Sequence, residues 1–314
     1  MQLKIGVEHE LAPGIIAGTD FTYINTVRST FQRDINLGPP VQDATGRYVF
    51  TSPRPYAPDF FIMQMTESSG RSLYRGFTYT FNIRRPRFTL DAFYTLSWKY
   101  STDDVEQDYS AISYDNVTDL GKEYNYSLTD QRHQFIAYGI YHLPFNFDVS
   151  STTRLSSARP FEVMTMWDYN RDDMQNDRPI VNGEALPRNP FRSRPFYDVS
   201  LRFQKHFVLP NEKGRFTASV EFFNLFGFDN VQVGHPNMMY GHGTAMQGGQ
   251  IVSGSTGPGR WYDPSVGKTY AGGSLVPVAP PANFNQLRDP SGKYYRTNVP
   301  GDPFQMQLGL RFQF

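Results

Sequence analysis

The residues best suited to bind a metal ion lie together in one acidic segment of the sequence. Asp168, Asn170 and Asp172 are spaced at every second position, and Asp177 follows closely. Side-chain oxygens at this spacing can converge on one hard cation, above all calcium, if the segment curls. The EF-hand pattern is incomplete, because both its turn glycine and its bidentate glutamate are missing. The segment therefore predicts either a calcium loop or a solvated acidic loop without metal.

Motifs for catalysis are missing from the sequence, which has no nucleophile elbow, zincin motif or phosphate-binding loop. Asp198 and His206 share one face of a predicted strand but lie too far apart to touch, at roughly 27 Å for the rise of a strand. The absence of cysteine excludes thiol catalysis and Cys-ligated zinc. We expect a protein that is not an enzyme and that has no cofactor, unless the acidic segment binds calcium.

The composition narrows the class of protein. The 314 residues include 30 Lys and Arg against 30 Asp and Glu, so no basic excess is available to bind nucleic acid. No apolar run approaches the roughly 18 residues that a transmembrane helix needs. Hydrophobic residues make up only 39% of the chain, yet aromatic residues reach 16%. Such a composition is typical of all-β proteins, either soluble or in an outer membrane.

Polar and apolar residues alternate over nine segments, which predicts strands with two different faces. The segment 304–314 is the clearest, since its even-numbered residues are all apolar and its odd-numbered residues are polar or small. The predicted strands are 2–8, 15–23, 61–84, 88–100, 135–143, 147–155, 197–207, 215–223 and 304–314.

The lengths of these strands and of their connections indicate a membrane barrel. Several strands reach the roughly 9 to 11 residues that span a bilayer, whereas strands of soluble proteins average about 5 to 6. Short and long connections alternate, as in outer-membrane barrels with short periplasmic turns and long extracellular loops. The short ones are 9–14, 85–87, 144–146 and 208–214, and the long ones are 29–59, 101–132, 156–196 and 227–303. We predict an all-β, antiparallel transmembrane β-barrel, present in part, with nine or ten long strands.

The alternation assigns side chains to the two sides of the predicted barrel wall. Charged residues on polar faces are expected to face the lumen: Asp91, Lys99, Arg202, Arg215, Glu221 and Arg311. Aromatic residues on apolar faces are expected to face lipid or form the interfacial girdles: Tyr94, Trp98, Tyr100, Phe203, Phe222 and Phe312.

The strand count has the wrong parity for a complete barrel. Nine strands with a periplasmic C-terminus would start outside the cell, whereas a complete bacterial barrel has an even number of strands. The N-terminus also lacks the apolar stretch of a signal peptide. We therefore expect residues 1–314 to be the C-terminal part of an outer-membrane barrel domain, without plug domain or signal peptide. Alternatively, a tenth strand lies within 45–52 or 248–254.

Several segments resemble the barrel of Oar-like TonB-dependent transporters. They are ESSGRSLYRGFTYTFNIRR (67–85), YTLSWKYSTDDV (94–105), LTDQRHQFIAYGIYHLPF (128–145), NDRP (176–179), RNPFRSRPFYDVSLRFQKHF (188–207) and ASVEFFNLFGFDN (218–230). The resemblance implies a 22-stranded barrel in the outer membrane of a Gram-negative cell, with an N-terminal plug and a segment that contacts TonB. It also implies that the final strand is the signal read by the barrel-assembly machinery, through Phe304, Leu308, Leu310, Phe312 and Phe314.

The predicted function is that of a receptor and transporter segment. Its polar strand faces would line the lumen, and its long loops would form the extracellular vestibule for an unidentified ligand. Outer-membrane lipid and the assembly machinery are the expected partners, and TonB would act only through a plug absent from this chain. The alternatives are a small self-contained pore or adhesin barrel, and a secreted β-sandwich that binds a ligand.

Overall fold

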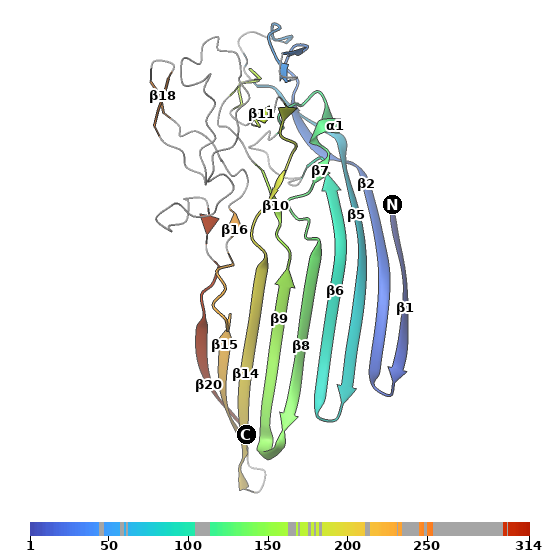
Figure 1. The fold of residues 1–314 in the computed structure, drawn as a ribbon, viewed down its shortest axis with the longest axis vertical. Helices are drawn as coiled ribbons and strands as arrows, with labels where there is room; N and C mark the ends of the chain where they lie inside the picture. Colours follow the sequence, from blue (N-terminus) through green and yellow to red (C-terminus); the bar gives the residue numbers. More distant parts are fainter. Residues whose placement is uncertain are drawn as a thin grey trace.

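The chain, described by a computed structural model, is built almost entirely from β-strands (Figure 1). The structure describes residues 1–43, 47–56, 60, 62–103, 114–162, 168, 170–174, 177–178, 180–181, 184–210, 214–230, 232–233, 245–247, 250–253, 298–299 and 301–314. Among these residues, no helix has the length and apolar character that crossing a membrane requires.

Nine long antiparallel strands form one sheet, and their order in the sheet follows their order in the sequence. The nine predicted strands are thereby confirmed. The strands are β1 (Gln2–Ala12), β2 (Ile15–Asp34), β5 (Gln64–Arg85), β6 (Phe88–Ser101), β8 (His133–Leu143), β9 (Phe147–Ser156), β14 (Phe196–Val208), β15 (Arg215–Phe223) and β20 (Gln305–Gln313). The largest difference from the sequence prediction is β2, whose 20 residues continue well past its predicted end at residue 23.

The remaining elements are short and lie in the connections. They are β3 (Val41–Gln42), β4 (Tyr48–Val49), α1 (Leu120–Glu123), β7 (Asn125–Tyr126), η1 (Pro144–Asn146), β10 (Pro160–Phe161), β11 (Ile180–Val181), β12 (Glu184–Ala185), β13 (Phe191–Arg192), β16 (Gln232–Val233), β17 (Ala245–Gln247), β18 (Gln250–Ser253) and β19 (Asn298–Val299). The two candidate tenth strands contain only β4 and β18 among their described residues. These pair with β3 and β17 in separate hairpins and do not join the main sheet.

The connections alternate between short and long, as predicted. The short ones lie at the end of the sheet that also holds the C-terminus, and the described parts of the long ones lie at the opposite end (Figure 1). The turn between β1 and β2 requires a glycine, because Gly14 has a φ of +69° and a Cβ there would collide with the carbonyl of Arg84. We call the layer formed by the long connections 35–63, 102–132 and 157–195 the loop layer.

The register of the sheet sorts side chains onto two faces. Asp91 lies opposite Asn82 on one side and Tyr138 on the other, and every later pairing continues this pattern as far as β20. We call the face that carries Asp91 the polar face and the opposite one the apolar face.

The apolar face remains exposed instead of packing into a core. On β20, Leu308 is 72% and Leu310 is 76% exposed. The few buried hydrophobic residues of the described chain lie mainly in the loop layer, where Tyr114 and Val117 form a small cluster with Phe31 from the end of β2. So large an exposed apolar surface marks an interaction with a membrane or a partner rather than with water.

The sheet has two free edges. β1 pairs only with β2, and β20 pairs only with β15, so the described strands do not close into a ring (Figure 1). Free edges of this length leave a row of unpaired backbone groups, which strands in a membrane must satisfy by pairing.

Candidate functional site

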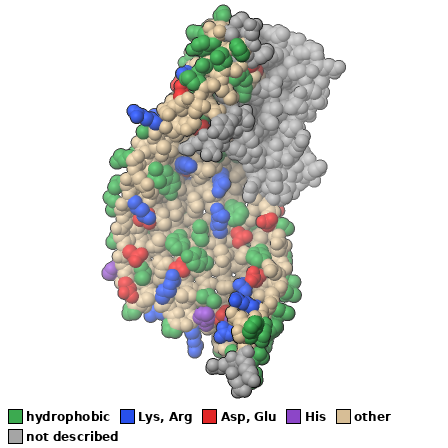
Figure 2. All heavy atoms as spheres, turned by 180° about the vertical axis from the view of Figure 1, so that it is seen from behind, with side chains coloured by type: hydrophobic (Ala, Val, Ile, Leu, Met, Phe, Trp, Pro, Cys, Tyr) green, Lys and Arg blue, Asp and Glu red, His purple; other side chains and the backbone are tan. Residues whose placement is uncertain are grey.

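The six charged residues predicted to face the lumen all lie on the polar face. Several are held by neighbours on the same face. Arg84 Nη2 donates to Asp91 Oδ1 at 2.6 Å, and Arg202 Nε donates to Glu221 Oε1 at 2.8 Å. Figure 2 shows acidic and basic side chains interspersed over the sheet rather than gathered in one patch. The polar face is therefore a mixed, water-compatible surface without a single centre of charge.

The aromatic residues predicted for the lipid side and its girdles all lie on the apolar face. Phe203 and Phe222 meet edge to face with ring centroids 6.4 Å apart. The proposed assembly residues also keep to this side: Leu308, Leu310 and Phe312 lie in β20, where the pairing puts them on the apolar face. Phe304 and Phe314 flank that strand, and both are exposed.

Near the short turns, a row of hydrogen-bonded side chains crosses four strands, and we call this row the polar chain. The sequence analysis did not predict it. Asp148 accepts from His142 Nδ1 at 2.7 Å and from His206 Nε2 at 2.8 Å, and His206 Nδ1 lies 2.9 Å from Thr217 Oγ1. The signal was present in the sequence, because the tight turn after Leu143 places His142 directly opposite Asp148. The hydrogen bonds of the polar chain link β8, β9, β14 and β15 on the polar face.

The acidic segment curls in the loop layer, as its spacing allows. The backbone N–H of Asp172 donates to Asp168 Oδ1 at 3.0 Å and to Asn170 Oδ1 at 2.9 Å. The N–H of Asn170 donates to Asp177 Oδ2 at 2.8 Å, and that of Met174 to Asp172 Oδ1 at 2.8 Å. The structure therefore brings the four predicted ligands into one turn, with oxygens accepting from backbone donors.

Metal binding by this turn stays a prediction. Within the described part of the chain, no group of three or more His, Cys, Asp or Glu residues is arranged to hold a metal ion. Burial nevertheless raises the pKa of Asp172 to about 7. It also raises the pKa of Asp168 and of Asp177, although the Arg47 guanidinium opposes the effect at Asp177. Desolvated carboxylates of this kind release their protons only reluctantly.

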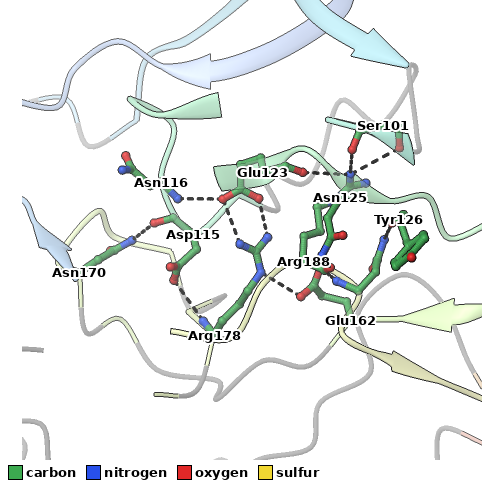
Figure 3. A network of polar contacts seen from close by, with 11 residues as sticks. Ser101, Asp115, Asn116, Glu123, Asn125, Tyr126, Glu162, Asn170, Arg178 and Arg188 are labelled. Carbon is green, nitrogen blue, oxygen red and sulfur yellow. Dashed lines mark hydrogen bonds and ion pairs between the residues drawn. The ribbon is translucent and has the colours of Figure 1, made fainter. Parts of the chain in front are cut away.

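Arg178 forms the centre of a buried ionic network just beside the acidic turn (Figure 3). Its Nη1 and Nη2 donate to the two oxygens of Glu123 at 3.0 and 2.5 Å, and its Nε donates to Glu162 at 2.9 Å. The three residues are at most 4% exposed. Burial raises the pKa of Glu162, and the guanidinium of Arg178 works against that rise. A buried bidentate ion pair of this kind is stabilising only while Arg178 and both glutamates are present.

Arg188 and Asn189 attach the same network to the end of the sheet. Arg188 Nη1 donates to the Ser101 carbonyl at the end of β6 at 2.7 Å. Asn189 Nδ2 donates to the Tyr126 carbonyl at 2.7 Å, and Asn125 Nδ2 donates back to the Arg188 carbonyl at the same distance. The connection 157–195 is thus anchored on top of β6 and β7.

The network also joins the acidic turn and the first long connection. Asp115 accepts from the backbone N–H of Arg178 at 3.1 Å, and its carbonyl accepts from Asn170 Nδ2 at 2.8 Å. Arg47 donates to the Arg178 carbonyl, and its Nη1 lies 3.7 Å from Asp177. Three long connections therefore share one buried polar centre. These contacts join the three connections to one another and so give the centre a structural role.

Comparison with known families agrees with this architecture. The family model described as outer membrane beta barrel domain matches residues 1–185, which is more than half of the chain. The chain belongs to this family. The protein is therefore located in the outer membrane. We expect the apolar face of this outer-membrane barrel chain to meet lipid.

The outer-membrane barrel chain is also similar in fold to a solved transporter structure. The outer membrane transporter YddB from Escherichia coli is similar, with 10% sequence identity and a TM-score of 0.47. The match covers 72% of this chain and 28% of that chain, so the barrel chain spans well under half of the transporter. No curated protein matches the sequence.

A charge placed on the lipid side of the outer-membrane barrel chain should be far more damaging than one placed on the other side. We expect Leu201→Arg, in the middle of β14 on the apolar face, to lower the free energy of unfolding in lipid by about 2–4 kcal/mol. Thr152→Arg is the matched control, since Thr152 lies at similar depth on the polar face. Urea titrations of protein folded into phosphatidylcholine vesicles measure both. Equal losses would contradict the assignment of the two faces.

Proposed function

We propose that the chain forms the C-terminal part of the barrel of an Oar-like TonB-dependent transporter. In this proposal the polar face lines the lumen, and the loop layer forms the rim through which an unidentified ligand enters. The observation that carries the proposal is a nine-stranded sheet with a wide polar face and two unpaired edges. Further strands joined to these edges would give a barrel wide enough for a plug, because diameter grows with strand number.

The proposed partners follow from the same arrangement. TonB would act through a plug held inside the completed barrel, and the polar chain around Asp148 would face that plug close to the short turns. The exposed apolar side chains of β20, ending at Phe314, would be recognised by the barrel-assembly machinery. A self-contained pore is the competing function, and it requires β1 to pair with β20.

Conductance separates the two functions. Protein extracted from outer membranes in its native assembly and placed in planar bilayers is expected to show no stable open channel, because a plug fills the transporter. Discrete, lasting conductance steps would support the pore and overturn the proposal.

A genetic measurement tests the dependence on TonB. In a growth screen over nutrient sources, loss of this protein and loss of TonB should cause the same defect on the imported nutrient, with no added defect when both are lost. A defect of the protein-deficient strain that persists independently of TonB would contradict energised uptake.

A further inference from the structure

Arginines and aromatic rings gather on the apolar face at the end of the sheet next to the loop layer. This arrangement is unexpected for a surface in contact with hydrocarbon, because charged groups are costly there. We call the group the arginine–aromatic belt; it consists of Arg71, Arg75, Trp98, Tyr100, Tyr124, Tyr126, Arg132 and Arg192.

The register places Arg71, Arg75, Trp98, Tyr100 and Tyr126 on the apolar face, and the other members of the belt contact these rings. Arg75 lies directly opposite Trp98, and Tyr100 lies opposite Tyr126. Farther along β5, towards the short turns, the same face carries the exposed rings of Phe77 and Tyr79. The face therefore changes from apolar to cationic within a few residues. Such a change, rich in Trp and Tyr, marks the level of the lipid headgroups.

The guanidinium groups of the belt stack on its rings. Arg71 lies 4.2 Å from the centroid of Tyr124, and Arg132 lies 4.9 Å from that of Trp98. Arg192 lies 5.0 Å from the centroid of Tyr126. Stacking uses the flat face of a guanidinium and leaves its N–H edges free to donate. Those edges match the paired oxygens of a phosphate group.

The belt has more positive than negative charge. The fully buried Asp130 accepts from Arg192 at 2.5 Å and lies 3.9 Å from Arg132. Arg71 and Arg75 are exposed, and neither has an ion pair with any residue that the structure describes. The belt thus has four arginines, and among the described residues the one carboxylate paired with any of them is Asp130, in a chain whose total charge is zero. The excess is local and available to an anion from outside.

We propose that the arginine–aromatic belt binds the phosphate groups of an anionic glycolipid in the outer leaflet of the membrane. Arg71 and Arg75 supply the unpaired charges, and the rings below them hold the lipid at the depth of its headgroup. Charge complementarity at headgroup level is what selects this partner. The inference needs the membrane location and the predicted orientation, with the loop layer outside the cell, and does not depend on transport or on TonB.

Lipid binding tests the proposal on the full-length protein in detergent. Native mass spectrometry would compare lipid A carrying two phosphates with the same lipid after removal of its phosphates. We expect the phosphorylated lipid to bind at least ten times more tightly. This comparison needs only the unmodified protein, so it stands even if a variant fails to fold. Equal affinity for the two lipids would overturn the proposal.

A matched pair of double variants locates the site. R71Q/R75Q is expected to weaken binding of the phosphorylated lipid at least tenfold. R85Q/R87Q removes two exposed arginines from the other end of the same β5–β6 hairpin and should leave binding unchanged. Heat-modifiable migration confirms that both variants are folded. An unaffected R71Q/R75Q protein, or competition by inorganic phosphate as strong as by the lipid, would show that the belt is not a lipid site.

Discussion

Replacing Arg178 by methionine is expected to loosen the loop layer by about 3–5 kcal/mol, because two buried carboxylates then lose their shared cation. Glu123 and Glu162 have almost no contact with solvent, so water cannot replace the guanidinium without opening the layer. Among the described residues, the network reaches the sheet only at the ends of β6 and β7, so the long strands should stay assembled. The change is therefore a local opening rather than loss of the barrel.

Proteolysis at the cell surface measures this opening. When opening is rapid, the rate of cleavage follows the population of the open form. A change of 3–5 kcal/mol then corresponds to an increase on the order of a hundredfold to a few thousandfold. Arg33→Met is the matched control, since Arg33 pairs with Glu67 at 3.1 Å but is partly exposed, and it should have little effect.

Removing the two carboxylate charges that the R178M variant leaves unpaired provides a second control. Adding E123Q and E162Q to R178M should restore much of the protection, because neutral side chains are less costly to leave unpaired. Cleavage of R178M at the unmodified rate would contradict the structural role of this network.

The loop layer is also expected to be more stable at pH 5 than at pH 8. The pKa of Asp172 is about 7 in the folded layer, whereas an unfolded aspartate has a pKa of about 3.9. Because the folded form binds this proton more tightly, its stabilising effect is complete below about pH 4 and disappears as the pH rises to about 7. The total change is about 4 kcal/mol at most. The raised pKa values of Asp168 and Asp177 act in the same direction.

Hydrogen exchange between pH 5 and 8, corrected for intrinsic rates, measures this dependence in the connection 157–195. Asp172→Asn should flatten the profile, and a protein whose protection rises with pH would contradict the expectation. The same measurement tests the calcium hypothesis. A bound cation would favour the ionised carboxylates, so millimolar calcium would remove the pH dependence and a chelator would restore it.

The sheet could be predicted from the sequence because its strands and faces depend on residues that lie close together along the chain. Alternation fixes which face each side chain takes, and the short turns fix the register, so Asp91 and Arg202 could be assigned to one face without a structure. The extension of β2 to Asp34 was missed because the chain beyond the membrane no longer has to alternate. There the strand is held by pairing with β5, which resumes after a bulge at Arg28.

The network of the loop layer could not be predicted, because its partners are distant in sequence. Arg178 and Glu123 are 55 residues apart, and no spacing rule links two irregular connections. The acidic segment was found through its own spacing, but its burial depends on contacts with Asp115 and Arg47 from other connections. The pKa of Asp172 is thus raised by burial that exists only when the loop layer is folded.

Cysteine accessibility tests the central claim, which is that alternate residues face water and lipid across one barrel wall. The chain has no cysteine of its own, so single substitutions can be labelled without background. Ser151 and Thr152 are neighbours in the middle of β9, on the apolar and the polar face respectively. In intact outer membranes, a charged thiol reagent should label T152C at least ten times faster than S151C, and both equally after unfolding. Equal rates in the membrane, or faster labelling of S151C, would contradict the account.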